Sequence, residues 1–335
     1  MMRPLRCALL SFAHVHAPSY AAALSRLPET ELVAIWDDDI ARGEQAAAQY
    51  NTDFSSDVTT LFGRPDVDAV IITAENRRHR ALCEAACGTG KHVLCEKPLA
   101  TTSEDALAMI AAAEQAGVTL ATAFPLRHSL PARRVKQQLE GKALGEVYAV
   151  RATNHGMLPP GWFQDPALAG GGAVMDHTVH VVDLLRWYLD DEPVEVYAEV
   201  SHGIYGLAVE DAALLTISFR SGVVATLDPS WSRPPSFPLW GDLTMEIAGQ
   251  RGTLALDAFA QKVVFNPRQS GRTEWLGWGA DADSPMLEDF ARAVRQGRRP
   301  AADGRDGERA LAVALAAYTS ARSGQPAPVA GNRSK

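Results

Sequence analysis

Residues 68–98 read DAVIITAENRRHRALCEAACGTGKHVLCEKP, and this stretch decides the fold of the N-terminal half of the chain. It contains two short apolar runs, 68–73 and 92–95, separated by a segment with helical spacing at 77–88. Two buried strands that alternate with helices are typical of a parallel sheet. The stretch therefore predicts one strand–helix–strand unit of a doubly wound fold.

The same alternation extends in both directions from this unit. We expect further strands at 5–10, 31–36 and 118–121, and further helices at 16–27, 38–50 and 103–117. These elements predict an α/β fold with an N-terminal Rossmann-type, doubly wound parallel sheet. The ligand crevice of such a sheet lies at the carboxyl ends of its strands.

The alternation stops after Phe124, and longer strands follow. We therefore expect two domains: a Rossmann-type domain over residues 1–123 and an α+β domain over residues 124–335. The second domain should hold a large, mostly antiparallel open sheet. Its strands are expected around 146–155, 194–204, 209–220, 222–231, 242–248, 252–257 and 261–265, with helices at 128–140, 173–189, 285–297 and 306–322.

Composition excludes several classes of protein. Of 335 residues, 47% are apolar and 21% are charged, and the net charge of −8 argues against a nucleic-acid partner. The four cysteines lack a paired zinc spacing, so we expect reduced, buried thiols and a cytoplasmic location. No apolar run is long enough for a membrane span, and the run 7–13 is expected to be a strand rather than a signal peptide.

The loop after the first strand, Ser11-Phe12-Ala13-His14-Val15-His16, occupies the place of a glycine-rich phosphate loop but contains no glycine. Ser11 and Ala13 are small enough for a pyrophosphate to approach, and the amides of residues 14–17 can bind phosphate at the helix start. Either histidine is expected to be an ordinary helix-start residue rather than a catalytic one.

Asp37 ends the second strand, where an acidic residue accepts hydrogen bonds from an adenosine ribose. A carboxylate there predicts NAD as the cofactor and makes NADP the less favoured one. The alternative is that these aspartates only cap the next helix, a function we assign to Asp38 or Asp39.

Two motifs carry groups for acid–base chemistry. Glu96-Lys97-Pro98 follows the strand 92–95, and the triple glycine 170–172 precedes Asp176 and His180. Residues four apart share a helix face, so Asp176 and His180 can reach one substrate group, and the glycines permit close approach of a ligand. The alternatives are a surface ion pair for Glu96 with Lys97 and a buried structural role for His180.

This succession, a strand with Glu-Lys-Pro and then Gly-Gly-Gly with Asp-x-x-x-His, resembles the Gfo/Idh/MocA family of NAD(P)-dependent oxidoreductases. The turn Thr73-Ala74-Glu75-Asn76-Arg77-Arg78-His79 is also similar to the family's Thr-Pro-Asn-x-x-His turn, although Ala74-Glu75 replaces its proline. The resemblance implies that His180 is the general base, while Lys97 and Asp176 bind the reacting and neighbouring hydroxyls. The cofactor-binding residues that we expect are Ser11, Phe12, Ala13, His14, Asp37, Thr73, Asn76, His79, Glu96 and Lys97.

Polar and aromatic residues of the second half are candidates for holding the substrate. Asp176, His177 and His180 suit zinc or manganese, but neighbouring helix positions diverge by about 100°, so we expect no metal and assign His177 to substrate contact. Trp162, Trp231 and Trp240 are equally compatible with core positions. The substrate-binding candidates are Arg127, Asn154, His155, Trp162 and His177.

The resemblance implies an NAD-dependent enzyme that interconverts a secondary alcohol and a ketone on a sugar, cyclitol or related polyol. Two alternatives stay open: a redox-assisted lyase or glycosidase that recycles bound NAD, and a non-catalytic ligand sensor. The family also pairs subunits through its open sheet, so we expect a homo-dimer or homo-tetramer.

Overall fold

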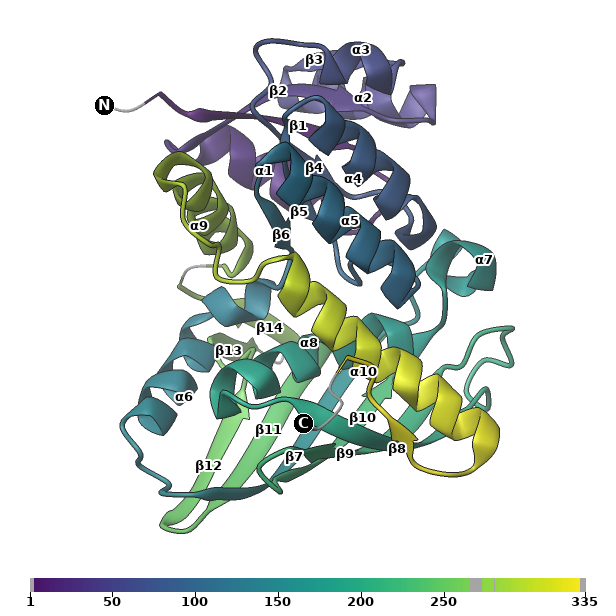
Figure 1. Ribbon diagram of the computed structural model, residues 1–335, viewed down its shortest axis with the longest axis vertical. Coiled ribbons are helices and arrows are strands. Elements are labelled where there is room, and N and C mark those ends of the chain that lie inside the picture. The colour runs from purple at the N-terminus through teal and green to yellow at the C-terminus, as the bar shows by residue number, and fades with distance from the viewer. Residues whose placement is uncertain (1–2, 266–272, 280, 332–335) are drawn as a thin grey trace. The chain divides into compact units, whose positions relative to one another are not determined.

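The computed structural model describes residues 3–265, 273–279 and 281–331. The chain forms two compact units, the first from Met1–His128 with Asp281–Glu308 and the second from Ser129–Ala280 with Arg309–Lys335 (Figure 1). The sequence-based division placed all of 124–335 in one domain, whereas here the segment 281–308 belongs to the first unit. No described helix is both long and apolar enough to cross a membrane.

The first unit contains a six-stranded sheet in the order β3-β2-β1-β4-β5-β6, and all its strand pairs are parallel. The order reverses between β1 and β4, so the loops after these two strands leave the sheet at its ligand-binding edge. This sheet confirms the predicted Rossmann-type fold. Its strands are β1 (Leu5–Leu10), β2 (Thr30–Trp36), β3 (Asp53–Ser55), β4 (Ala69–Ile72), β5 (His92–Cys95) and β6 (Leu120–Thr122).

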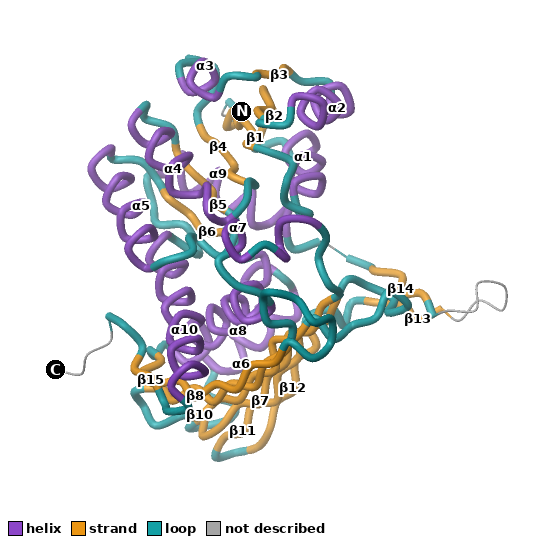
Figure 2. The backbone as a smooth tube through the Cα atoms, turned by 90° about the vertical axis from the view of Figure 1, so that its right-hand side faces the viewer, coloured by secondary structure: helices purple, strands orange, loops and turns teal. Residues whose placement is uncertain are grey.

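Helices cover both faces of this sheet (Figure 2). Tyr20 and Leu24 of α1 share one apolar core with Leu287 and Phe290 of α9, and all four side chains are buried. Burial of this apolar face explains why α9 packs with the first unit, although it follows the strands of the second unit in sequence. The helices are α1 (Ala17–Arg26), α2 (Ile40–Tyr50), α3 (Val58–Phe62), α4 (His79–Gly88), α5 (Ser103–Ala116) and α9 (Asp283–Gln296), with 3-10 turns η1 (Asn76–Arg78) and η2 (Pro125–His128).

The second unit contains a seven-stranded sheet in the order β12-β11-β7-β10-β9-β8-β15. Its strand pairs are antiparallel apart from the parallel pair β7 and β10, which confirms the mostly antiparallel prediction. The expected strand at 261–265 lies outside this sheet and forms a hairpin with a later strand. The strands are β7 (Val147–Gly156), β8 (Pro193–Ser201), β9 (Ala212–Phe219), β10 (Val224–Ser230), β11 (Gly241–Gly249), β12 (Gly252–Asp257), β13 (Lys262–Phe265), β14 (Glu274–Gly277) and β15 (Ala327–Pro328).

Helix α8 packs against β7, β9 and β10 and against α6. Nearly every side chain in its first three turns is buried, including the polar residues Asp176, His177 and His180. Charged and imidazole groups are rarely buried without a specific partner, so α8 is where the chemistry of this unit must be sought. The helices of the unit are α6 (Leu130–Glu140), α7 (Pro166–Ala169), α8 (Ala173–Leu189) and most of α10 (Gly304–Ser323), with the 3-10 turn η3 (Gly161–Gln164).

Candidate active site

The glycine-free loop after β1 adopts a backbone turn that usually requires glycine. Ser11 has a φ of 76°, in the left-handed region that L-residues rarely adopt. The hydroxyl of Thr73, which follows β4, donates a 2.6 Å hydrogen bond to the carbonyl of Ser11. The amide of Ser11 donates to the carbonyl of Trp36 at the end of β2. Neighbouring strands thus hold a serine in the position where a dinucleotide-binding loop usually has its first glycine.

Most backbone amides of this loop donate hydrogen bonds to other groups of the protein. Phe12 donates to Asp37 (2.8 Å), Ala13 to the hydroxyl of Ser11 (3.2 Å) and His14 to the carbonyl of Thr73 (3.1 Å). The amides of His16 and Ala17 both donate to His14. Three of the four amides predicted to bind phosphate, those of His14, His16 and Ala17, are therefore already bonded within the protein, and a phosphate bound there would replace these bonds.

Asp37, at the end of β2, has a fully buried carboxylate that is held ionised. Its oxygens accept two hydrogen bonds from Arg42 (2.6 and 2.8 Å) and one from each of two backbone amides. Burial opposes ionisation, but the Arg42 guanidinium and the amides keep the pKa of Asp37 below its usual value. Asp39 accepts from the amide of Arg42 and caps α2, as predicted, so Asp37 does not cap the helix.

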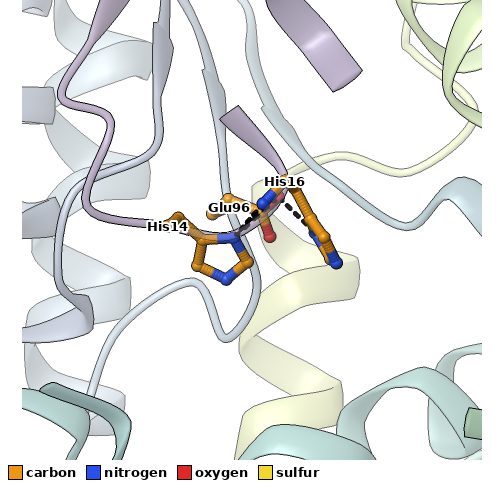
Figure 3. A group of neighbouring side chains, drawn as sticks. All are labelled: His14, His16 and Glu96. Carbon is orange, nitrogen blue, oxygen red and sulfur yellow. Dashed lines mark hydrogen bonds and ion pairs between the residues drawn. The ribbon is translucent and has the colours of Figure 1, made fainter. Parts of the chain in front are cut away.

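Glu96, directly after β5, lies between two imidazoles (Figure 3). Its Oε1 is 2.9 Å from Nδ1 of His16 and 3.8 Å from Nδ1 of His14, and its Oε2 accepts from the amide of Lys97. Burial opposes ionisation of Glu96, yet His14 and His16 keep its pKa well below the usual range. The prediction that the histidines are ordinary helix-start residues is incomplete, because His16 uses its ring for Glu96 and not to cap α1.

His79 joins two loops of the ligand-binding edge. One ring nitrogen faces the carbonyl of Ala74 and the other faces the carbonyl of Pro98, each at 3.1 Å. Burial is the largest influence on this residue and lowers the pKa of His79, although the carbonyls that its ring faces oppose this effect. His79 therefore ties the turn after β4 to the Glu-Lys-Pro turn, and its contact with a cofactor stays a prediction, as it does for the buried Asn76.

The triple glycine before α8 leaves room for the protein itself. A Cβ on Gly171 would overlap the hydroxyl of Tyr318, and one on Gly172 would overlap the carbonyl of Glu210. One carboxylate oxygen of Glu210 accepts from the amides of Gly172 and Val174, each at 2.9 Å. These two glycines therefore leave room for the protein groups that fix the start of α8, and close approach of a ligand to them stays a prediction.

Asp176 lies one turn into α8, and its carboxylate is close to the side chains of Trp231 and His177. Oδ2 accepts from the indole Nε1 of Trp231 (3.0 Å) and is 3.3 Å from Nε2 of His177. Gly156, at the end of β7, leaves space for the His177 ring, because a Cβ there would come within 2.7 Å of Cε1. Trp231 is fully buried and so acts on Asp176 rather than on a sugar face.

Asn154 and His155, each predicted to contact substrate, are successive strand residues and so point to opposite faces of the sheet; their contacts with substrate stay predictions. Asn154 is buried and donates to the carbonyl of Asp242 (2.9 Å). The His155 ring lies between Asp228 (3.1 Å) and Asp242 (3.0 Å). Burial opposes its charge, but the two carboxylates raise the pKa of His155 to about 9. The His155 ring is thus part of an ionic cluster with Asp228, Asp242 and Arg233, in which Arg233 donates to Asp242.

The other two predicted substrate residues also have internal partners. The buried Arg127 donates to the carbonyl of Ala301 and is paired with Asp306 at 3.4 Å, so it holds the returning segment 298–308 on the first unit. Trp162 stacks on Phe163 with ring centroids 3.9 Å apart. Contacts of these two residues with substrate therefore stay predictions.

Known families match both halves of the chain. Residues 10–124 match the model "Oxidoreductase family, NAD-binding Rossmann fold", and residues 132–255 match the "GFO/IDH/MocA C-terminal domain". The predicted fold, the enzyme class and the cofactor NAD are thereby confirmed.

Individual relatives extend these matches over most of the chain. The 1,5-anhydro-D-fructose reductase of Ensifer adhaerens is 34% identical over 309 residues, which are 89% of this chain and 91% of the relative. The myo-inositol 2-dehydrogenase of Thermotoga maritima is 29% identical over 78% of this chain and 79% of its own. Among solved structures, GenD2 from gentamicin A biosynthesis in complex with NAD superposes with a TM-score of 0.90 at 25% identity, covering 98% of this chain and 97% of GenD2.

Proposed function

Because this chain belongs to the Gfo/Idh/MocA family of oxidoreductases, we propose that it interconverts a secondary alcohol and a ketone on a sugar, cyclitol or related polyol. The observation that carries this proposal is the buried carboxylate of Asp176, oriented by Trp231 on the helix that also holds His180. A polyol offers neighbouring hydroxyls that such a carboxylate can accept from. The names of the relatives, a sugar-derivative reductase and an inositol dehydrogenase, support the same substrate class.

The first unit fits its cofactor at two points. The left-handed Ser11 supplies the turn that a dinucleotide loop needs, and the end of β2 carries the ionised carboxylate of Asp37, which a ribose would reach in place of one of its present hydrogen bonds. NAD, when bound, exchanges the two electrons and the hydrogen of the carbinol carbon. We assign Ser11, Phe12, Ala13 and His14 to the phosphate side and Asp37 to the ribose.

The protein must move the hydroxyl proton. His180 is assigned as the general base, because an imidazole titrates near neutral pH, and Asp176 binds a neighbouring hydroxyl of the same polyol. Lys97 is assigned to the reacting hydroxyl, as a second proton carrier and hydrogen-bond donor. Its position supports this assignment, since it follows β5 and its own amide is bonded to Glu96.

We also propose a homo-dimer or homo-tetramer that forms through the open face of the large sheet. Tyr148, Tyr197, Leu214 and Val224 are exposed apolar side chains of strands β7 to β10. An uncovered apolar sheet face favours association. A cytoplasmic location agrees with the four free, buried cysteines.

The test begins with the purified protein and mass spectrometry for co-purified NAD. Production of NADH is then followed with myo-inositol and simple glucosides, and oxidation of NADH with 1,5-anhydro-D-fructose. Steady turnover with one of these classes is expected. Consumption of substrate without net NADH would instead indicate transient oxidation in a lyase or glycosidase, and binding of sugar without any turnover would indicate a sensor.

A further inference from the structure

His14 and His16, on the loop after β1, and Glu96, after β5, form a compact cluster of groups that can bind a metal (Figure 3). One nitrogen of each ring and one carboxylate oxygen all lie within 4.8 Å of one another. The two nitrogens facing Oε1 of Glu96 are 2.9 and 3.8 Å away. Ligand atoms about 2.0–2.1 Å from a tetrahedral zinc are roughly 3.3 Å apart, so the observed separations bracket this value.

We propose that His14, His16 and Glu96 bind one divalent transition-metal ion of the zinc type. Two imidazoles and a carboxylate are the ligand set of catalytic zinc centres, which leave a fourth position for water or another ligand. Softer, thiolate-dependent ions are disfavoured because none of the three groups contains sulfur. The proposed sugar chemistry assigns no metal to the reaction, but this site shares His14 with the residues assigned above to the phosphate side of NAD, so metal binding and NAD binding are measured separately.

The surroundings of the cluster suit a cation that enters from one side. The side chains of His14 and Glu96 are at most 1% exposed, whereas that of His16 is 30% exposed. The negative charges of Glu96 and of Asp283 on α9 both act on His16, and Lys97 opposes them. Two carboxylates against one ammonium leave a negative balance that a divalent ion offsets.

Binding would replace contacts that the ligands now make. Nδ1 of His14 accepts the amide of His16 at 3.1 Å, and Nδ1 of His16 shares a proton with Glu96. Each of these contacts is a single hydrogen bond, and the bond from the same nitrogen to a metal ion would replace it. A cation therefore needs only small shifts of two rings that already converge on one oxygen.

Metal binding is measured on the tag-free full chain after dialysis against a chelator. The protein is titrated with Co²⁺, followed by visible absorption, and with Zn²⁺, followed by calorimetry. One equivalent of each ion is expected to bind. His16→Gln and Glu96→Gln should each weaken binding by at least about 100-fold, since each removes one of three ligands.

Two matched variants serve as controls: His202→Gln, at an exposed loop residue, and Glu84→Gln, on the surface of α4. Both should bind the metal as the wild type does. Failure of the wild type to bind either ion, or undiminished binding by His16→Gln, would overturn the proposal. If Glu96→Gln does not fold, His14→Gln and His16→Gln decide the matter, and a parallel NAD titration separates loss of the metal from loss of the cofactor site.

Discussion

The indole Nε1 of Trp231 donates a hydrogen bond to Oδ2 of Asp176 across 3.0 Å, and both side chains are buried. Trp231→Phe removes this donor and retains an aromatic ring. We expect kcat/KM to fall by roughly tenfold, about 1.4 kcal/mol, through a higher KM, because Asp176 loses the bond that orients it. Steady-state kinetics on the best substrate checks this, with the exposed Trp278→Phe as control. Unchanged kinetics would show that the indole only fills space.

Lys97→Ala and His180→Ala should each lower turnover by about 10² to 10⁴, the usual range for loss of a positioned proton carrier. NAD affinity should fall much less than turnover, because neither side chain is assigned to the ribose or to the phosphate side of the cofactor. Turnover and NAD titrations are compared with Lys262→Ala and His202→Ala. Near-wild-type turnover in either variant would remove that residue from the proposed mechanism.

The wild type should bind NAD more tightly than NADP, because ionised Asp37 repels a 2′-phosphate and accepts from a 2′-hydroxyl. Asp37→Ser should narrow this preference, since it also releases the Arg42 guanidinium for a phosphate. Calorimetric titrations with both cofactors measure the effect. The double variant Asp37→Ser with Arg42→Ala should lose the gain in NADP affinity that Asp37→Ser produces. Equal affinities of the wild type for NAD and NADP would contradict the assignment of Asp37 to the ribose.

Ser11→Gly should be more stable than Ser11→Ala by about 1 kcal/mol, because only glycine adopts a φ of 76° without strain. Both variants lose the hydroxyl that the amide of Ala13 binds, so the comparison isolates the backbone term. Urea unfolding gives the difference in the free energy of unfolding. NAD binding should persist in Ser11→Gly, and an equal stability of the two variants would exclude strain at this position.

His155 predicts a defined dependence of stability on pH. Burial opposes its charge, but Asp228 and Asp242 raise the pKa of His155 to about 9, against about 6.5 in an unfolded chain. The stabilisation is therefore complete below about pH 6.5 and is lost as the pH rises through 9. Urea unfolding of the wild type and of His155→Gln should show a stability difference of about 1 kcal/mol at pH 6, since Asp228 is solvent-accessible. The difference should vanish above pH 9, and a difference independent of pH would contradict the assignment.

Local patterns in the sequence determined the longer strands and helices of the first unit and the class of the second, but not the short elements β3 and α3. Apolar runs such as 69–72 and 92–95 form parallel strands, and Asp39 caps α2, because periodicity and capping depend on residues close in the chain. The position of Glu96 at the end of β5 and the spacing of Asp176 and His180 on α8 could be predicted from the sequence for the same reason.

Tertiary packing alone decided which side chains meet. The imidazole of His16 reaches Glu96, Trp231 reaches Asp176, and Gly172 admits Glu210, although none of these pairs lies within 35 positions in the chain. The sequence offered one signal for the first pair, the spacing His14-Val15-His16 typical of metal ligands, but not the carboxylate that completes it. Such contacts follow from the order and register of strands and from the packing of helices on them, which the periodicity of a single segment does not contain.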